Sequence, residues 1–306
     1  MPDNNANNLY EKVVNAGGSR DRTTVKEALR GLSLDEEVDF ELYQNMRLLT
    51  ESEYTLNRQL GYVSLNSQLQ DDEALYVSFE YTIAGSQRVF RVGEFSIDQT
   101  ENQGTPSVLF VKTLKPGRQA VVTADRRQFP TWDLMMKNFY SIGGFNIQED
   151  KFNIEVVYQS TDGSGDINYL PTSTVANTPL VQVFDMDRLT NNKELGADNR
   201  FDYIPGISIQ PDKGTVVLTR LEPFGQHLVN QFTANRQEDS IRYAFTALYR
   251  QTQQDAIQFS PQVNRFKLRG RYSAKSSSEI YLNTVQLTPG SVKVLAGGRQ
   301  LQEGID

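Results

Sequence analysis

Residues 54–83 read YTLNRQLGYVSLNSQLQDDEALYVSFEYTI, the clearest strand–turn–strand pattern in the chain. Polar and apolar side chains alternate from Tyr62 to Asn66, and Leu75, Val77 and Phe79 share one parity. Such alternation places one apolar face of a sheet toward a core and leaves the other wet. Polar and glycine residues at 57–61 and 70–73 are typical of turns. We therefore predict a three-strand meander over 54–57, 62–69 and 74–83.

The same patterns, applied outward from this stretch, predict an α+β fold that is mainly β. We expect antiparallel β-sandwich-like units with short helices and one longer helix near 239–259. The predicted helices cover 23–32, 132–141 and 239–259. The predicted strands include 88–97 paired with 74–83, a hairpin of 108–114 with 118–124, and 145–147, 152–158, 180–184, 204–210, 215–221, 265–272, 279–287 and 291–295.

Four regions follow from shifts in composition along the chain. Residues 1–35 are predicted to be a flexible segment with a short helix. Residues 36–142 form a β-rich domain, and 143–236 form a second β-rich unit. Residues 237–306 hold the long helix and β-hairpins, truncated at the C-terminus. The sequence at 53–69 is echoed at 202–221, which indicates a reused hairpin, and the polar start and abrupt end suggest a piece of a larger protein.

Composition narrows the function classes. The 306 residues include no cysteine and one histidine, which removes thiolate chemistry and most zinc sites. The net charge of −7 argues against a general nucleic-acid surface. Mean hydropathy is −0.51, and no apolar run approaches the roughly 20 residues of a membrane helix. We expect a chain that does not itself span a membrane.

A loop rich in oxygen ligands is the one candidate metal site. Calcium prefers six to eight oxygen ligands, and this loop concentrates them without the spacing of an EF-hand. The alternative is a solvated, turn-rich loop. The candidate calcium ligands are Asp185, Asp187, Asn191, Asp198 and Asp202.

Two other features favour structural interpretations. Arg265, Lys267, Arg269 and Arg271 alternate along one strand, which fits a solvent face or a charged edge better than a nucleic-acid groove. His227 follows Glu222-Pro223-Phe224-Gly225 without any nucleophile motif nearby in sequence, so a loop histidine is expected. No phosphate-binding or dinucleotide motif is present. We therefore expect neither an enzyme nor a required cofactor.

Several stretches resemble the SprA/Sov family. They are ESEYTLNRQLGYVSLNSQL at 51–69, YVSFEYT at 76–82 followed by RVGEFS at 91–96, PTWDLMMKNFYSIGG at 130–144, LEPFG at 221–225 and GSVKVLAGGRQLQEGID at 290–306. This family comprises the giant outer-membrane translocon proteins of type IX secretion in Bacteroidota, which are also linked to gliding motility. The resemblance extends from about residue 36 to the end, and PTWDLMMKN and LNRQLGYVSLN are its most specific pieces.

The resemblance implies a soluble structural, gating or partner-binding domain of such a translocon. The implied partners are secreted cargo proteins, a barrel-associated shuttle protein and a periplasmic plug. The implied location is the cell envelope at the outer membrane, with the extracellular face favoured and the periplasm as the alternative. A second function class stays open: a cell-surface adhesion module of β-sandwich type that binds carbohydrate or calcium.

Overall fold

The computed structural model describes residues 1–70, 72–98, 108–123, 127–274, 295–296 and 299–300. These residues belong to two compact units. The first comprises Met1–Met46 with Asp71–Ser276, and the second comprises Arg47–Gln70 with Ser277–Asp306. The predicted boundaries at 35, 142 and 236 do not coincide with this division. In the described residues, no helix is both long and apolar enough to cross a membrane.

Two short helices begin the first unit. Helix α1 covers Leu9–Asn15, within the stretch expected to be flexible. Helix α2 covers Val25–Gly31 and confirms the helix predicted at 23–32. Val25 and Leu29, one turn apart, are the buried residues of α2. This i, i+4 pair gives the helix its apolar face.

Two antiparallel strand pairs follow, and their partners differ in part from the prediction. Strand β4 (Phe79–Thr82) pairs with β5 (Val89–Val92), as predicted. The rings of Tyr81 and Phe90, opposite each other in this pair, stack at 5.1 Å. Strand β3 (Leu75–Val77), however, pairs with β6 (Lys112–Lys115). The predicted hairpin of 108–114 with 118–124 is therefore wrong, because the partner of its first strand lies about 40 residues earlier in the chain.

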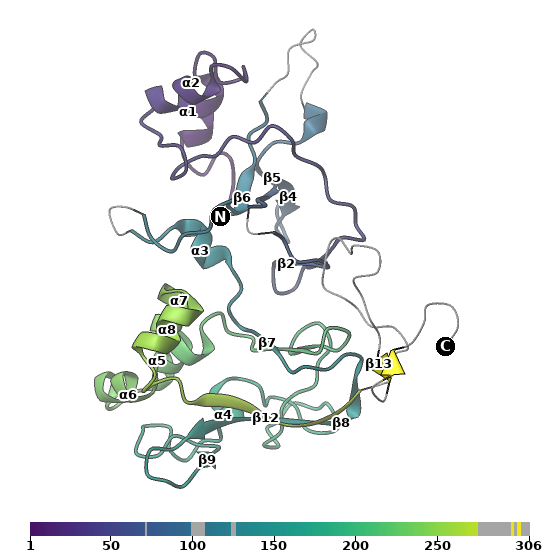
Figure 1. The fold of residues 1–306 in the computed structure, drawn as a ribbon, viewed down its shortest axis with the longest axis vertical. Coiled ribbons are helices and arrows are strands. Elements are labelled where there is room, and N and C mark those ends of the chain that lie inside the picture. Colours follow the sequence, from purple (N-terminus) through teal and green to yellow (C-terminus); the bar gives the residue numbers. More distant parts are fainter. Residues whose placement is uncertain (71, 99–107, 124–126, 275–294, 297–298, 301–306) are drawn as a thin grey trace. The chain divides into compact units, whose positions relative to one another are not determined.

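The longest strands of the first unit pair across more than 100 residues of sequence. Strand β8 (Ile147–Gln159) joins the predicted segments 145–147 and 152–158, and it pairs with β12 (Phe266–Ala274) (Figure 1). Gly270 allows this close approach, since a Cβ there would lie 2.0 Å from the carbonyl oxygen of Asn153. Strand β9 (Asp166–Ile167) pairs with the end of β8.

A second small sheet corrects the helix predicted at 132–141. Helix α3 covers only Pro130–Leu134, and β7 (Phe139–Ser141) then pairs with β11 (Thr215–Val217), which also pairs with β10 (Ile209–Gln210). The side-chain amide of buried Asn138 donates to the carbonyl of Leu218 at 2.6 Å. These long-range backbone pairings override the helical spacing of the local apolar residues.

The predicted strand at 180–184 is instead helix α4 (Leu180–Val183). Leu180, Val181 and Val183 are all buried. A short continuous apolar run does not distinguish a buried strand from a buried helical turn, which explains the error.

The single helix predicted at 239–259 is wrong as well. This region folds as α6 (Arg236–Tyr243), α7 (Ala247–Arg250) and α8 (Gln253–Phe259), preceded by the π-helical turn η2 (Pro223–His227) and α5 (Leu228–Gln231). Ala244 is extended, and the Phe245 amide leaves the helical ladder to donate to the carbonyl of Phe224 at 2.6 Å. Burial of Phe245 accompanies this break.

An aromatic cluster forms the centre of the main core. The rings of Phe224 and Phe266 stack at 4.9 Å, and Phe184 meets both edge-on at 5.0 and 5.6 Å. Offset and edge-on pairs of this kind stabilise cores beyond the area that they bury. The cluster thereby joins helix α4, turn η2 and strand β12.

The described part of the second unit contains two hairpins. Strand β1 (Tyr54–Asn57) pairs with β2 (Tyr62–Leu65) around Gly61, whose φ is +70°, and this confirms the predicted pairing of strands at 54–57 and 62–69. Asn57 closes the turn by accepting from the Leu60 amide at 2.9 Å. Strand β13 (Leu295–Ala296) pairs with β14 (Arg299–Gln300). The strand predicted at 279–287 and most of that at 291–295 lie outside the described residues.

The fold is therefore mixed α+β with antiparallel strands in small sheets. The third strand of the predicted meander does not join the β1–β2 hairpin, because β3 pairs with β6. The echo of that hairpin at 202–221 does contain a hairpin, formed by β10 and β11.

Candidate functional site

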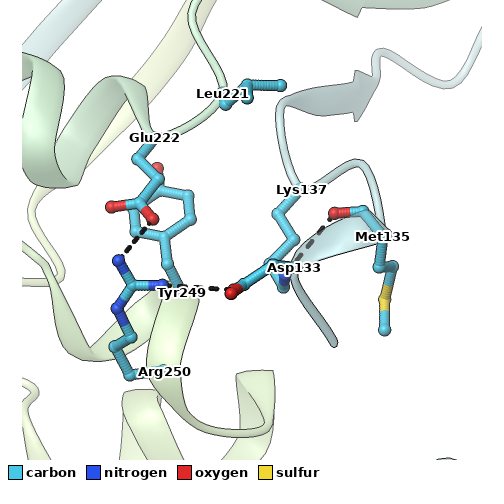
Figure 2. Close-up of a pocket in the computed structure, with 7 residues that line it drawn as sticks. All are labelled: Asp133, Met135, Lys137, Leu221, Glu222, Tyr249 and Arg250. Carbon is cyan, nitrogen blue, oxygen red and sulfur yellow. Dashed lines mark hydrogen bonds and ion pairs between the residues drawn. The ribbon is translucent and has the colours of Figure 1, made fainter. Parts of the chain in front are cut away.

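An open cavity of about 190 Å³ lies between α3 and the chain that follows it on one side and turn η2 and helix α7 on the other (Figure 2). We call it the charged recess. Its lining residues are Asp133, Met135, Lys137, Leu221, Glu222, Tyr249 and Arg250.

Trp132 fixes the α3 side of the charged recess. Pro130 occupies the first turn of α3, where a missing N–H costs nothing. The buried indole of Trp132 then donates to the carbonyl of Tyr249 at 2.9 Å. Met135 is extended and ends the helix. The recess is thus held by a contact across 117 residues of sequence.

Tyr249 forms the floor of the charged recess. Its side chain is buried, and its hydroxyl accepts from the Phe224 amide at 3.1 Å. Burial raises the pKa of Tyr249 well above its usual range and raises the pKa of the neighbouring Tyr140 to about 12. A Cβ at Gly225 would lie 2.7 Å from the Tyr249 ring, so the backbone of η2 packs directly against it. Tyr249 therefore stays neutral and acts as a rigid support.

Each charged side chain of the charged recess has a partner within the chain. Arg250 bridges two carboxylates, contacting Glu222 at 2.8 Å and Asp133 at 3.3 Å (Figure 2). The Lys137 ammonium donates to the carbonyls of Trp132 and Met135 at 2.5 and 3.4 Å. Burial lowers the pKa of Lys137, whereas Asp133 and Glu222 act in the opposite direction. Two cations and two carboxylates thus give a neutral rim.

Apolar side chains stand beside this neutral rim. Leu221 is 64% exposed, Leu134 52% and Met135 43%. Leu221 and Met135 both line the charged recess. Exposed apolar groups next to charges that already have partners are a composition suited to contact with another protein surface.

Three of the predicted calcium ligands, Asp187, Asp198 and Asp202, lie near one another, and backbone N–H groups donate to each of these carboxylates. Asp187 is buried and accepts from the amides of Asp198 and Asn199, both at 2.8 Å. Asp202 accepts from the amides of Arg188 and Leu189 at 2.7 and 3.2 Å. Burial raises the pKa of Asp202, and the nearby carboxylates of Asp187 and Asp198 raise it further.

The remaining predicted ligands lie apart from this group. Asp185 forms ion pairs with Arg188 at 2.8 Å and with Arg220 at 2.5 Å. Asn191 is exposed. Among the described residues, no three His, Cys, Asp or Glu side chains are placed to hold a metal ion.

Calcium binding stays a prediction. If the loop binds calcium, added calcium should raise the melting temperature of the chain, and Asp187→Asn should abolish that rise. An unchanged melting temperature in the unsubstituted chain would end the calcium hypothesis.

The basic strand and the histidine both have partners within the folded chain. On β12, Lys267 pairs with Asp166 at 3.0 Å and Arg269 with Glu155 at 2.8 Å. Cross-strand pairs of this kind fit the predicted solvent face. His227 lies in η2, and its Nε2 is 2.8 Å from the carbonyl oxygen of Val183.

Sequence reasoning did not single out the charged recess as a site. Most lining residues belong to PTWDLMMKN and LEPFG, two of the stretches on which the predicted resemblance to the translocon family rests. These stretches are about 90 residues apart, and only the folded chain places them around one cavity. No protein-family model matches this chain, and no match to a curated protein was found.

Proposed function

We propose that this chain is a structural and partner-binding domain of a giant outer-membrane translocon of the SprA/Sov type. One observation supports this proposal most directly. The stretches PTWDLMMKN and LEPFG, which resemble that family, line the same recess with exposed apolar side chains and internally paired charges. The charged recess then contacts a secreted cargo protein or another component of the translocon.

The side chains of the charged recess favour contact over chemistry. Arg250 is held by two carboxylates, and Lys137 by two backbone carbonyls. The side chains that remain available to a partner are Leu221 and Met135, both exposed. Rim charges of this kind set orientation and partner choice, while apolar contacts supply most of the affinity.

Site-specific photo-crosslinking in cells tests this proposal. A photoreactive amino acid replaces Leu221 in the parent protein, and Leu195 provides the matched control because it is 91% exposed and does not line the recess. We expect position 221 to yield crosslinks that mass spectrometry identifies as secreted proteins or translocon components, and position 195 to yield none. Equal crosslinking at both positions, or none at 221, would contradict the proposal.

A substitution separates contact from folding. Leu221→Asp places a charge on a side chain that is 64% exposed, so the stability of the chain should change by no more than about 0.5 kcal/mol. The crosslinks formed by a photoreactive group at Met135 should nevertheless fall. Retained crosslinks to the same partners would show that the recess is not their contact surface.

A further inference from the structure

The first residues of the chain contact β5 and the residues that flank it. The Asn4 amide donates to the carbonyl of Arg91 at 2.7 Å. The Tyr81 hydroxyl donates to the carbonyl of Pro2 at 2.7 Å, and Arg88 pairs with the Asp3 carboxylate at 2.8 Å. Three consecutive residues therefore contact a strand pair that lies more than 75 residues later in the chain.

Both the nitrogen and the oxygen of the Asn4 side-chain amide are hydrogen-bonded to Gly93. Its nitrogen donates to the carbonyl of Gly93 at 3.0 Å, and its oxygen accepts from the Gly93 amide at 2.9 Å. Asn4 is only 8% exposed, so the loss of either bond would leave a buried polar group unsatisfied. An aspartate lacks the donor, and an alanine lacks both groups. The Gly93 backbone therefore selects a carboxamide.

The backbone at Gly93 requires glycine. Its φ is +74°, and a Cβ there would lie 2.5 Å from the Ser78 hydroxyl oxygen. This conformation presents both the N–H and the C=O of Gly93 to one side chain. The neighbouring Glu94 is buried and paired with Arg20, which anchors the receptor side of the contact.

Charge selects the residue before the asparagine. The Asp3 side chain is 6% exposed and pairs with Arg88, whose side chain is 61% exposed. The Arg91 amide also points to the Asp3 carboxylate, at 3.5 Å. An uncharged residue at this position would lose the ion pair, and a basic one would repel Arg88.

We propose that β5 and Gly93 form a recognition site for a peptide segment that carries aspartate followed by asparagine at the start of a turn, as residues 3–6 do. Residues 2–4 are its intramolecular occupant, and the partner is a protein segment of the same chemistry that displaces them. One main-chain bond, from the Asn4 amide to the Arg91 carbonyl, fixes the segment on β5, and the side chains of Asp3 and Asn4 give the specificity. The tethered segment has a high effective concentration, so the site is closed until a competing segment binds.

Peptide binding to the full chain tests this inference. The probe is a fluorescent peptide of residues 2–6, Pro-Asp-Asn-Asn-Ala, followed by fluorescence anisotropy. The Asn4→Ala chain should bind it at least about tenfold more tightly than the unsubstituted chain, because its own segment competes less well. A peptide with aspartate in place of its first asparagine should lose that affinity.

Two protein variants check the location. In the Asn4→Ala chain, Arg88→Glu should weaken binding of the peptide because it reverses the charge that faces the aspartate. Arg236→Glu is the matched control on helix α6 and should leave binding unchanged. If Asn4→Ala does not fold, Asp3→Asn is a milder substitution that also weakens the contact of residues 2–4 with the site. Excess peptide should then raise the melting temperature of the Asp3→Asn chain.

Three results would overturn the inference. If the Asn4→Ala or Asp3→Asn chain folds but does not bind the peptide, the proposed site does not exist. Equal binding of the original and aspartate-substituted peptides would show that Gly93 does not select asparagine. A dimer of the unsubstituted chain that Asn4→Ala dissolves, measured by light scattering, would assign the site to a second copy of this chain.

Discussion

At the scale of single residues, Glu94 carries the contact between the N-terminal helices and the strands. Arg20 binds both oxygens of this buried carboxylate, at 2.6 and 2.7 Å. The Tyr10 hydroxyl and the Phe110 amide also donate to it, at 2.7 and 2.9 Å. Burial alone would raise the pKa of Glu94, but these donors together hold it below its usual value. The carboxylate is therefore ionised, and both of its oxygens accept hydrogen bonds.

Glu94→Gln should lower the free energy of unfolding by about 2 to 3 kcal/mol, because it removes the charge that compensates Arg20 and breaks charge-assisted hydrogen bonds. Urea denaturation followed by circular dichroism measures this loss. Glu238→Gln is the control, since Glu238 is 68% exposed in a surface pair with Arg242. Its effect should stay below about 0.5 kcal/mol. Equal losses would contradict the structural role of Glu94.

His227 makes stability depend on pH. Burial lowers its pKa in the folded chain; Asp185 and the Val183 carbonyl oppose this, while Arg220 and Arg188 add to it. The unfolded chain therefore binds the proton more readily, and the stabilising contribution is complete above about pH 6.5 and lost as the pH falls through the folded pKa.

The His227→Gln chain should lose less stability than the unsubstituted chain between pH 7 and pH 5. Urea denaturation across this range measures the difference. The chain has a single histidine, so one imidazole signal in an NMR titration reports the folded pKa directly. A midpoint at or above 6.5 would contradict the effect of burial. The sequence predicted a loop histidine, and its partner Val183, 44 residues away, could not be inferred from local pattern.

At the scale of elements, sequence patterns correctly predicted those helices and hairpins that depend on interactions between neighbouring residues. The β1–β2 hairpin and helix α2 follow from alternation, turn residues and helical spacing within a few residues. The helices predicted at 132–141 and 239–259 failed where a distant partner intervened. Strand β11 takes 139–141 into a sheet, and the carbonyl of Phe224 draws the Phe245 amide out of the helical ladder. These competing contacts are not encoded in neighbouring residues.

Helix α8 gives a test of this local control. The Thr252 side chain caps it by accepting from the Asp255 amide at 3.2 Å. Thr252→Ala should lower the free energy of unfolding by about 1 kcal/mol, because a first-turn amide loses its acceptor. Gln258→Ala, at an exposed position of the same helix, should stay within about 0.5 kcal/mol. Urea denaturation of both variants makes the comparison. A loss equal to that of the control would show that the cap does not hold α8.

At the scale of the whole molecule, the charged recess illustrates what a sequence cannot show. Its two sides come from 133–137 and from 221–222 with 249–250. The residues drew attention only through resemblance, and their pairing depends on the Trp132–Tyr249 contact. The acidic loop, by contrast, was identified from composition. The backbone amides that donate to Asp187 are evident only in the folded structure. Composition therefore located the polar cluster, but its hydrogen-bond partners depend on the fold.

The extracellular position that the resemblance implies gives a prediction for intact cells. The chain has no cysteine, so a single introduced thiol can be labelled without background labelling of other residues of this chain. Leu195→Cys lies at a side chain that is 91% exposed, and Val157→Cys, at a fully buried position, is the control. A membrane-impermeant maleimide should label the parent protein carrying Leu195→Cys in intact cells and leave Val157→Cys unlabelled. Labelling that requires permeabilised outer membranes would place this part of the chain in the periplasm instead, where the charged recess would meet cargo before export and not after it.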